Sequence, residues 1–224
     1  MVGLLCIPFG INAAFHDSSA CLVKDGRLLS AAEEERFTHI KHGKRPVPFS
    51  TYELPFHAIH YCLLKEGITI KDVDHVAYSF DPWLLLDQNK YDQTICLPLE
   101  PSANPKPEEW LNVWDPLFLS SIVNAPRQLR DGYPHHLASV FDVENNPKQQ
   151  WHFVDHHLSH AASTYLASPY SDAAVMVIDG RGEKITTSYY TGEGNELKRI
   201  SQVEQPNSLG LFYEEMTDYL GFLR

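Results

Sequence analysis

Three histidines stand close together in the stretch VDHHLSHAAS, which covers residues 154–163. If the stretch is a helix that begins near His156, then His156 and His160 take positions i and i+4, on one side of the helix. That spacing lets two imidazoles share one metal ion, whereas His157 points elsewhere. The alternative is a histidine-rich helix start without any chemistry, and the stretch alone leaves both interpretations open.

Two turns rich in small and polar residues could hold an anion. The turns, NAAFHDSSA and DGRGEKITT, each follow an apolar strand and offer backbone N–H groups and hydroxyls. The second turn adds glycines, which let the backbone approach a ligand closely, and a carboxylate that can hold a metal or order its waters. An ordinary hairpin turn is the alternative for each. The candidate cofactor-binding residues of these turns are Ser18, Ser19, Gly180, Gly182, Glu183, Thr186 and Thr187.

The composition is ordinary for a globular protein and narrows the choice of partners. The 224 residues are 43% hydrophobic and 21% charged, enough apolar material for one large domain or two small ones. A net charge of −11, without a basic cluster beyond KHGKR, argues against a nucleic-acid partner. No apolar run approaches the roughly 18 residues that cross a membrane. The four cysteines stand singly, which indicates reduced thiols. We therefore expect a cytoplasmic protein that binds neither nucleic acid nor membrane.

The hydrophobic pattern predicts two β-meanders, each followed by helical segments. The pair Asp25-Gly26 marks a hairpin between the second and third strands, and Gly67 ends the first long helix. Residues 81–107 are expected to form an inserted loop. The expected strands cover residues 4–11, 20–24, 27–32, 72–80, 150–155, 173–178, 184–190 and 197–203. The expected helices cover residues 52–66, 108–130 and 135–141, the segment from 156 onwards, and the segment after PNSLG.

The order of these elements predicts the fold class. One complete unit of order β-β-β-α-β-α-β-α is followed by β-β-β-α, about half of a second unit. This order resembles the duplicated lobes of the actin, hexokinase and chaperone ATPase superfamily, in which ATP binds between the lobes. We therefore predict an α/β protein in which residues 1–170 form an actin/hexokinase-like, ribonuclease H-like lobe with a mixed sheet. Residues 171–224 are expected to begin a second lobe that is incomplete.

Packing in the manner of that superfamily brings Asp179 close to the helix that carries His156 and His160. Two imidazoles and one carboxylate leave coordination positions open for water or a substrate oxygen, as in catalytic metal sites. This ligand set suits Fe²⁺, Mn²⁺ or Zn²⁺ better than Ca²⁺. The sequence therefore predicts a divalent-metal site formed by these three residues.

Four stretches, in order along the chain, resemble a known family. HDSSACLVKDGRLLSAAEEERFTHIKH, VDHHLSHAAS, VIDGRGEKITTS and PNSLGLFYEEMTDYLGF are similar to the N-terminal part of the NodU/CmcH-type O-carbamoyltransferases. The resemblance covers nearly the whole chain and is looser over residues 81–150. It implies transfer of a carbamoyl group from carbamoyl phosphate, through an ATP-derived carbamoyl adenylate, to a hydroxyl of a sugar, antibiotic or nodulation-type small molecule. It also implies that His156, His160 and Asp179 hold the family's metal, for which Fe²⁺ is our first choice.

The first of these stretches holds the candidate catalytic residues, assigned by position. His16 is an imidazole not committed to the metal and is our candidate for taking the proton of the acceptor hydroxyl. Asp17 either orients His16 or binds a substrate hydroxyl, and Lys41 with His42 reaches the phosphate or carbamoyl group. In the alternative interpretation, residues 33–36 are an internally paired surface segment.

The chain stops one helix into the second unit, and family members are much longer. We expect the chain to be incomplete for catalysis by itself. In the family, later segments supply a fourth metal ligand, which is a carboxylate, and the domain that makes the adenylate. An unpaired sheet edge and an apolar helix face predict self-association or a missing C-terminal partner. One alternative is a truncated, non-catalytic remnant or a nucleotide- or metal-binding module. The other is a related transferase of the threonylcarbamoyl or hydrogenase-maturation type, although the acidic charge disfavours a tRNA substrate.

Overall fold

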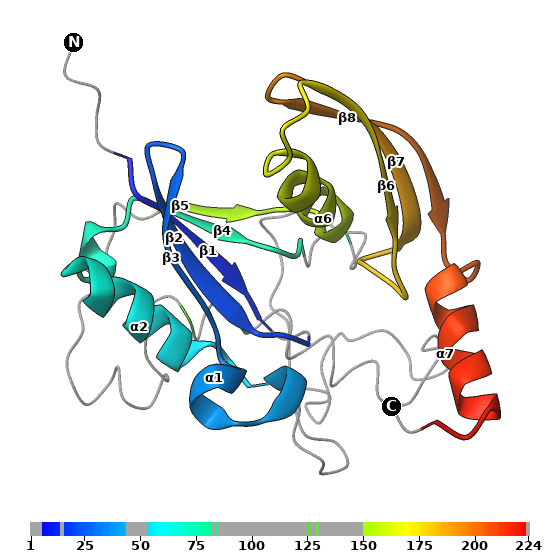
Figure 1. Cartoon of the computed structure of the whole chain (residues 1–224), viewed down its shortest axis with the longest axis horizontal. Coiled ribbons are helices and arrows are strands. Elements are labelled where there is room, and N and C mark those ends of the chain that lie inside the picture. The colour runs from blue at the N-terminus through cyan, green and yellow to red at the C-terminus, as the bar shows by residue number, and fades with distance from the viewer. Residues whose placement is uncertain are drawn as a thin grey trace, which may run out of the picture. The chain divides into compact units, whose positions relative to one another are not determined.

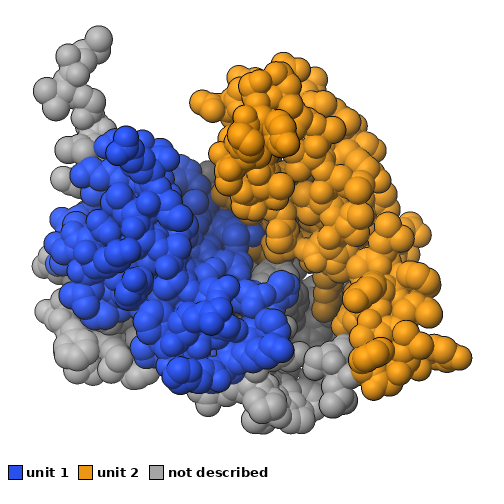
Figure 2. Space-filling view, in the orientation of Figure 1, with its two compact units in different colours: residues 1–79, 89–153 blue, residues 80–88, 154–224 orange. Residues whose placement is uncertain are grey.

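The computed structural model describes residues 6–13, 16–43, 53–81, 84, 125, 129 and 150–222. Nearly all of the helices expected over residues 108–130 and 135–141, and of the loop expected over 81–107, lies outside these ranges. Ala125 and Leu129, within the first of these helices, are described and are helical. The chain divides into two compact units, residues 1–79 with 89–153 and residues 80–88 with 154–224 (Figure 2). The expected division into lobes at residue 170 stays a prediction.

The first unit is built on a mixed sheet of five strands, as the sequence predicted (Figure 1). Strand order is β3-β2-β1-β4-β5. The first three strands are antiparallel neighbours, whereas β1, β4 and β5 run parallel to one another. The strands are β1 (Pro8–Asn12), β2 (Ser19–Lys24), β3 (Arg27–Glu33), β4 (His75–Tyr78) and β5 (Gln150–Phe153).

The predicted hairpin between β2 and β3 is confirmed. Asp25 and Gly26 both have positive φ angles, 49° and 73°, as a two-residue turn of this kind requires. The strand before it, β1, is central in the sheet, and its Phe9 and Ile11 are buried. Gly10 faces Cys21 so closely that a Cβ atom would lie 2.6 Å from the cysteine sulfur.

Helix α2 (Phe56–Glu66) packs on β2 and β3 through Ala58, Ile59 and Cys62. It begins four residues later than the sequence predicted, because Pro55 occupies the N-cap position. The predicted end is confirmed, since Gly67 adopts the left-handed conformation with φ 66°. The shorter elements α1 (Glu35–Thr38), η1 (Lys41–Gly43) and η2 (Ile70–Asp72) also belong to this unit.

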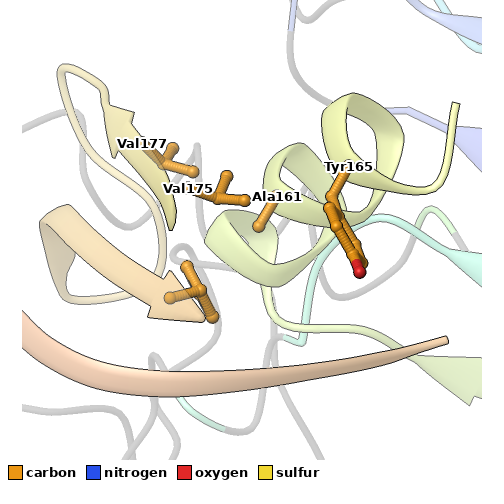
Figure 3. Packing of buried hydrophobic residues seen from close by; sticks show 5 residues of the cluster. Ala161, Tyr165, Val175 and Val177 are labelled. Atoms are coloured by element: carbon orange, nitrogen blue, oxygen red, sulfur yellow. The ribbon is translucent and has the colours of Figure 1, made fainter. Parts of the chain in front are cut away.

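In the described part of the second unit, helices flank an antiparallel sheet. Strands β6 (Asp172–Ile178), β7 (Ile185–Glu193) and β8 (Glu196–Glu204) follow one another in the order β6-β7-β8. Helix α6 (His156–Tyr165) packs on the sheet, and α7 (Leu209–Tyr219) follows β8. The core between α6 and the sheet consists of Ala161, Tyr165, Val175, Val177 and Tyr190 (Figure 3).

The alternation of side chains along β6 shows which face of the sheet is covered. Val175 and Val177 are buried against α6, whereas Met176 and Ile178 point to the opposite face and are exposed. Among the described residues, every helix falls short of the length and apolarity that crossing a membrane requires.

Candidate metal centre

Helix α6 brings His156 and His160 to one side, as their spacing predicted. The helix begins at His156 because the carboxylate of Asp155 occupies the N-cap position and accepts a hydrogen bond of 2.8 Å from the N–H of Leu158. The ring centroids of His156 and His160 lie 4.6 Å apart, and their two Nε2 atoms are separated by 3.1 Å. Both imidazoles therefore present the same nitrogen to one point.

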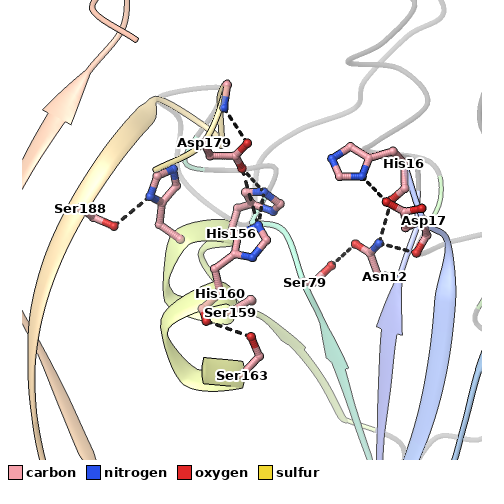
Figure 4. Close-up of polar contacts among 12 residues, drawn as sticks. Asn12, His16, Asp17, Ser79, His156, Ser159, His160, Ser163, Asp179 and Ser188 are labelled. Atoms are coloured by element: carbon pink, nitrogen blue, oxygen red, sulfur yellow. Dashed lines mark hydrogen bonds and ion pairs between the residues drawn. The ribbon is translucent and has the colours of Figure 1, made fainter. Parts of the chain in front are cut away.

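Asp179 reaches that point from the end of β6 (Figure 4). Its Oδ2 lies 2.8 Å from the Nε2 of His156 and 3.6 Å from the Nε2 of His160. Its Oδ1 accepts a 2.6 Å hydrogen bond from the N–H of Gly180, so the carboxylate is held in one orientation. The three residues that the sequence grouped together thus converge within the second unit.

The spacing of the three ligand atoms fits a divalent cation. Bonds of about 2.0–2.2 Å to Nε2 and carboxylate oxygen put neighbouring ligand atoms roughly 2.8–3.6 Å apart in octahedral or tetrahedral geometry. Hydrogen bonds alone cannot account for both short contacts of the Nε2 atom of His156. A hydrogen on the Nε2 of His156 can be donated to Asp179, but that nitrogen then has no lone pair for His160. One cation accepts all three lone pairs.

Burial and charge also favour a cation. Burial raises the pKa of Asp179, but hydrogen bonds with His156 and His160 outweigh this effect and hold the pKa well below its ordinary range, so the carboxylate is ionised. The side chain of His156 is only 8% exposed, that of Asp179 24%, and that of His160 49%. The ligand set is therefore anchored on the side of His156 and accessible on the side of His160.

Glu183, which the sequence assigned to cofactor binding, lies behind His156. It is buried, and its carboxylate accepts hydrogen bonds from the backbone N–H of His156 at 3.0 Å and of Asp81 at 2.7 Å. Burial raises the pKa of Glu183 to about 7, despite the hydrogen bonds that oppose this rise. In this structure Glu183 supports the first turn of α6, and its role in binding a cofactor stays a prediction.

His157, which the spacing directed away from the metal ligands, is fully buried. Its Nδ1 lies 2.8 Å from the hydroxyl of Ser188, and burial lowers its pKa, which favours the neutral ring. Within the described ranges, its Nε2 has no hydrogen-bond partner. Gly182 lies against both neighbouring histidines: a Cβ atom there would be 3.0 Å from Cδ2 of His157 and 3.3 Å from Cβ of His156. The second glycine of the turn is thus required by the close approach of the turn to α6.

An ion pair connects the start of α6 to the sheet. Arg199 on β8 donates a 2.7 Å hydrogen bond to the carboxylate of Asp155 and further hydrogen bonds to the hydroxyl of Tyr190. Sequence reasoning missed these three residues. An aspartate at the junction of a strand and a helix is a recognisable N-cap signal, but no sequence pattern pairs it with an arginine 44 positions later.

The backbone at Asp179 is fixed from the side of α7. The hydroxyl of Ser208, the N-cap residue of α7, donates to the carbonyl oxygen of Gly180 at 2.7 Å and lies 3.2 Å from that of Asp179. Gly210 lies so close that a Cβ atom would overlap the backbone of Asp179 and Gly180. The stretch PNSLG therefore matters to the site through its backbone packing, which its composition did not indicate.

The remaining candidates of the second turn lie in the sheet. Thr186 and Thr187 are buried in β7, and the hydroxyl of Thr186 donates to the carbonyl oxygens of Val203 and Asn207. Gly180 borders Asp179 directly. Of this turn, the structure therefore brings Gly180, Gly182 and Glu183 next to the proposed metal ligands. The assignment of the threonines to a cofactor stays a prediction.

The first polar turn belongs to the other unit and forms its own cluster (Figure 4). The Nδ1 of His16 lies 2.6 Å from Oδ2 of Asp17, and the backbone carbonyls of both residues accept hydrogen bonds from the side chain of Asn12. Ser18 is buried with its hydroxyl 2.5 Å from the carbonyl oxygen of Glu53, Ser19 begins β2, and Lys41 is exposed in η1.

The acidic segment of residues 33–36 divides into two parts. Arg36 pairs with Glu33 at 3.0 Å and with Glu35 at 3.3 Å, as expected of an internally paired surface segment. Glu34, by contrast, is buried and caps α2 from a distance, accepting from the N–H of Ala58 at 2.9 Å and lying 2.6 Å from the Nδ1 of His57.

Comparison with known proteins identifies the family. The family model described as the carbamoyltransferase N-terminus matches residues 8–224. The chain belongs to this family. The match extends over both compact units, so the candidate metal centre and the cluster around Asp17 lie within the matched residues.

Relatives of known sequence agree with this membership. An uncharacterized protein, sll1178, of Synechocystis sp. is 35% identical over 214 residues, which cover 95% of this chain and 32% of that protein. Nodulation protein NolNO of Sinorhizobium fredii is 32% identical over 215 residues, covering 94% of this chain and 26% of that protein. The chain thus spans a third or less of the length of these relatives.

Among solved structures, YeaZ from Pseudomonas aeruginosa is similar with a TM-score of 0.43 and 14% sequence identity. The similarity covers 90% of this chain and 68% of that one.

Proposed function

We propose that this chain is the N-terminal part of a metal-assisted O-carbamoyltransferase. Membership of the carbamoyltransferase family and similarity to a nodulation protein support carbamoyl transfer in general. The finer proposal is transfer from carbamoyl phosphate, through an ATP-derived carbamoyl adenylate, to a hydroxyl of a small molecule such as a sugar. The observation that carries it is the convergence of His156, His160 and Asp179 on one point.

These three residues are proposed to hold the cation, with Fe²⁺ preferred and Mn²⁺ or Zn²⁺ as alternatives. A bound cation would supply Lewis-acid stabilisation of the charge that develops on a carbamoyl or phosphate oxygen. The chain's own contribution is orientation. Glu183 and Asp155 fix the first turn of α6, and Gly180 fixes the carboxylate of Asp179, so the ligand atoms need little rearrangement to bind an ion.

His16 is proposed as the general base for the acceptor hydroxyl. In this step the hydroxyl oxygen forms a bond to the carbamoyl carbon, the bond from that carbon to the adenylate phosphate oxygen breaks, and the proton passes to Nε2 of His16. The contact of 2.6 Å between Nδ1 of His16 and Asp17 supports this role, because it leaves Nε2 as the nitrogen that accepts a proton. Lys41 is proposed to attract the phosphate.

We also propose a specific fold for the first unit. Three antiparallel strands followed by two parallel ones, in the order β3-β2-β1-β4-β5, support an actin-like, ribonuclease H-like lobe that takes ATP as co-substrate. Cys21 and Cys62 are free thiols, which supports a cytoplasmic location.

Metal analysis tests the site directly. The chain is saturated with Fe²⁺ under anaerobic conditions, or with Mn²⁺ or Zn²⁺, dialysed, and its metal content and affinity are measured. The double variant His156→Ala with His160→Ala should lose at least about 100-fold in affinity, since residues that merely support metal ligands cost 10–100-fold. The matched control replaces two exposed histidines elsewhere, His60→Ala with His152→Ala, and should bind as the wild type does. Equal metal content in both double variants would remove the site.

Activity is tested with carbamoyl phosphate, ATP, the metal, and a panel of sugar and aminoglycoside acceptors. A carbamate ester on the acceptor, detected by mass spectrometry and absent from the double variant, would support the transferase. Metal binding without any product would instead support a metal-binding module that does not catalyse transfer by itself.

A further inference from the structure

The carboxylate of Asp17 lies between two imidazoles. Its Oδ2 is 2.6 Å from the Nδ1 of His16, and its Oδ1 is 2.9 Å from the Nδ1 of His42. Both oxygens are therefore engaged by histidines, one from the adjacent position and one from η1. The sequence placed His42 near the phosphate or the carbamoyl group, whereas in this structure its Nδ1 is directed to Asp17.

The charge of Asp17 determines which nitrogens carry hydrogen. Burial raises the pKa of Asp17, but the hydrogen bonds with His42 and His16 outweigh it and lower the pKa below the ordinary value. An ionised carboxylate can only accept hydrogen bonds, so the Nδ1 atoms of both histidines must donate. In neutral His16 the lone pair is then on Nε2, the nitrogen that a general base needs.

The backbone around this cluster is held in sparsely populated conformations. Asp17 and His42 both have positive φ angles, 59° and 56°, and the N–H of Asp17 donates to the carbonyl oxygen of His42 at 3.0 Å. The N–H of His42 donates in turn to the carboxylate of Glu35 at 2.9 Å. Such conformations persist only where surrounding contacts enforce them, so the position of His42 is determined by both Asp17 and Glu35.

We propose that His42 is a positioning residue for the His16–Asp17 pair. Its Nδ1–H holds Oδ1 of Asp17, so that Oδ2 faces His16 and keeps the proton of that ring on Nδ1. The inference rests on the proposed role of His16 as general base. It adds a residue that acts through Asp17 without touching the substrate.

Two variants separate this role from a general effect on folding. His42→Gly removes the donor but accepts a positive φ angle without strain. His42→Asn keeps an N–H donor near the position of Nδ1 and also tolerates the left-handed conformation. The readout is the tautomer of His16, measured by long-range ¹H–¹⁵N correlation of its ring nitrogens, assigned with the help of His16→Gln. Backbone amide spectra confirm that each variant is folded.

Wild type and His42→Asn should hold His16 in the Nδ1–H form. In His42→Gly the ratio of the Nδ1–H to the Nε2–H form should fall by about three- to tenfold, the size expected when one ordinary hydrogen bond is lost. An unchanged ratio in His42→Gly would overturn the proposal, as would an Asn variant that behaves like the Gly variant.

A competing explanation is a cation held by the cluster itself, since ligand atoms of Asp17, Glu35 and His42 lie within 4.8 Å of one another. The same spectra are recorded with Zn²⁺ on the variant that lacks His156 and His160. Shifts of the His42 ring nitrogens at stoichiometric Zn²⁺ would overturn the positioning role. The tautomer measurement needs no carbamoyl transfer, so failure of the activity assay counts against the proposed function and leaves this inference intact.

Discussion

Two of the three proposed metal ligands, His156 and Asp179, are fixed through backbone atoms that the metal would not use. The N–H of His156 donates to Glu183, and the N–H of Asp179 donates to the carbonyl oxygen of Thr186 at 2.9 Å. The close contact of Gly210 with the backbone of Asp179 and Gly180 adds a steric limit on the other side. The geometry of the site therefore depends on residues that are not themselves proposed metal ligands.

Gly210→Ala should distort the candidate metal site by displacing the backbone that carries Asp179. The added methyl group would overlap the backbone of Asp179 and Gly180, and backbone cannot move aside as a flexible side chain can. An alanine in the first turn of α7 gains helix propensity, but we expect the overlap to dominate and to lower the free energy of unfolding by about 1–3 kcal/mol. Denaturant unfolding and metal titration would both show the change.

Gly180→Ala is the matched control for that prediction. Its φ angle is not positive, and a Cβ atom there would meet Leu211 at 3.9 Å, an ordinary van der Waals contact. We expect a change in stability within about 0.5 kcal/mol. If both alanine variants behaved alike, the close approach of α7 to Asp179 would not be what fixes the carboxylate.

At the scale of elements, the packing of α6 on its sheet determines where His156 and His160 point. Tyr165 packs over Gly192 of β7, where a Cβ atom would lie 2.5 Å from the ring, and its hydroxyl donates to the carbonyl oxygens of Ser171 and Gly194. At the other end of the helix, Asp155 joins the cap to Arg199. Contacts at both ends therefore fix the helix along its axis and in rotation.

The N-cap of α6 should contribute through two separable interactions. Asp155→Ala removes the acceptor for the N–H of Leu158 and the partner of Arg199, and should lower the free energy of unfolding by at least about 2 kcal/mol. About 1 kcal/mol of this comes from the cap and a similar amount from the hydrogen bond to a charged group. Urea denaturation of the metal-free chain measures it without interference from the ion.

Asp155→Asn distinguishes the two interactions. Asparagine is also a good N-cap residue, but it lacks the charge that faces Arg199, so this variant should lose about half as much stability as Asp155→Ala. Equal losses for both variants would assign the whole effect to the ion pair. No loss for Asp155→Asn would assign it to the cap.

At the scale of the whole molecule, large apolar side chains remain exposed in the second unit. Met176 and Ile178 are 58% and 49% exposed on the face of the sheet opposite α6, and Tyr189 lies beside Met176 on β7. Apolar side chains that are exposed together on one face of a sheet favour association with another surface. The chain spans a third or less of its relatives, and we expect copies of the isolated chain to associate through this face.

Charges on that face should suppress the association. Met176→Lys with Ile178→Lys should shift the sedimentation coefficient toward that of a monomer and lower the concentration dependence seen with the wild type. Leu166→Lys, at an exposed position at the end of α6, is the control and should leave the association unchanged. A wild type that stays monomeric at high concentration would contradict the expectation.

Local sequence patterns determined much of this protein. The i, i+4 spacing of His156 and His160, the Asp25-Gly26 hairpin and the stop at Gly67 each follow from the conformational preferences of a few adjacent residues. The strands of both meanders were predicted to within a few residues for the same reason, because alternation of apolar side chains is a local signal. Asp179 was joined to the histidines by the expected packing of the units rather than by its own neighbours.

Only the tertiary structure decided which polar groups serve the site and which serve the scaffold. Glu34 and Glu183 look like surface or ligand carboxylates in the sequence, yet both are buried against backbone N–H groups at the starts of α2 and α6. Their roles depend on partners 24 and 27 positions away. The free energy of burying a charge depends on whether such partners are within reach, which is a property of the folded chain and not of neighbouring residues.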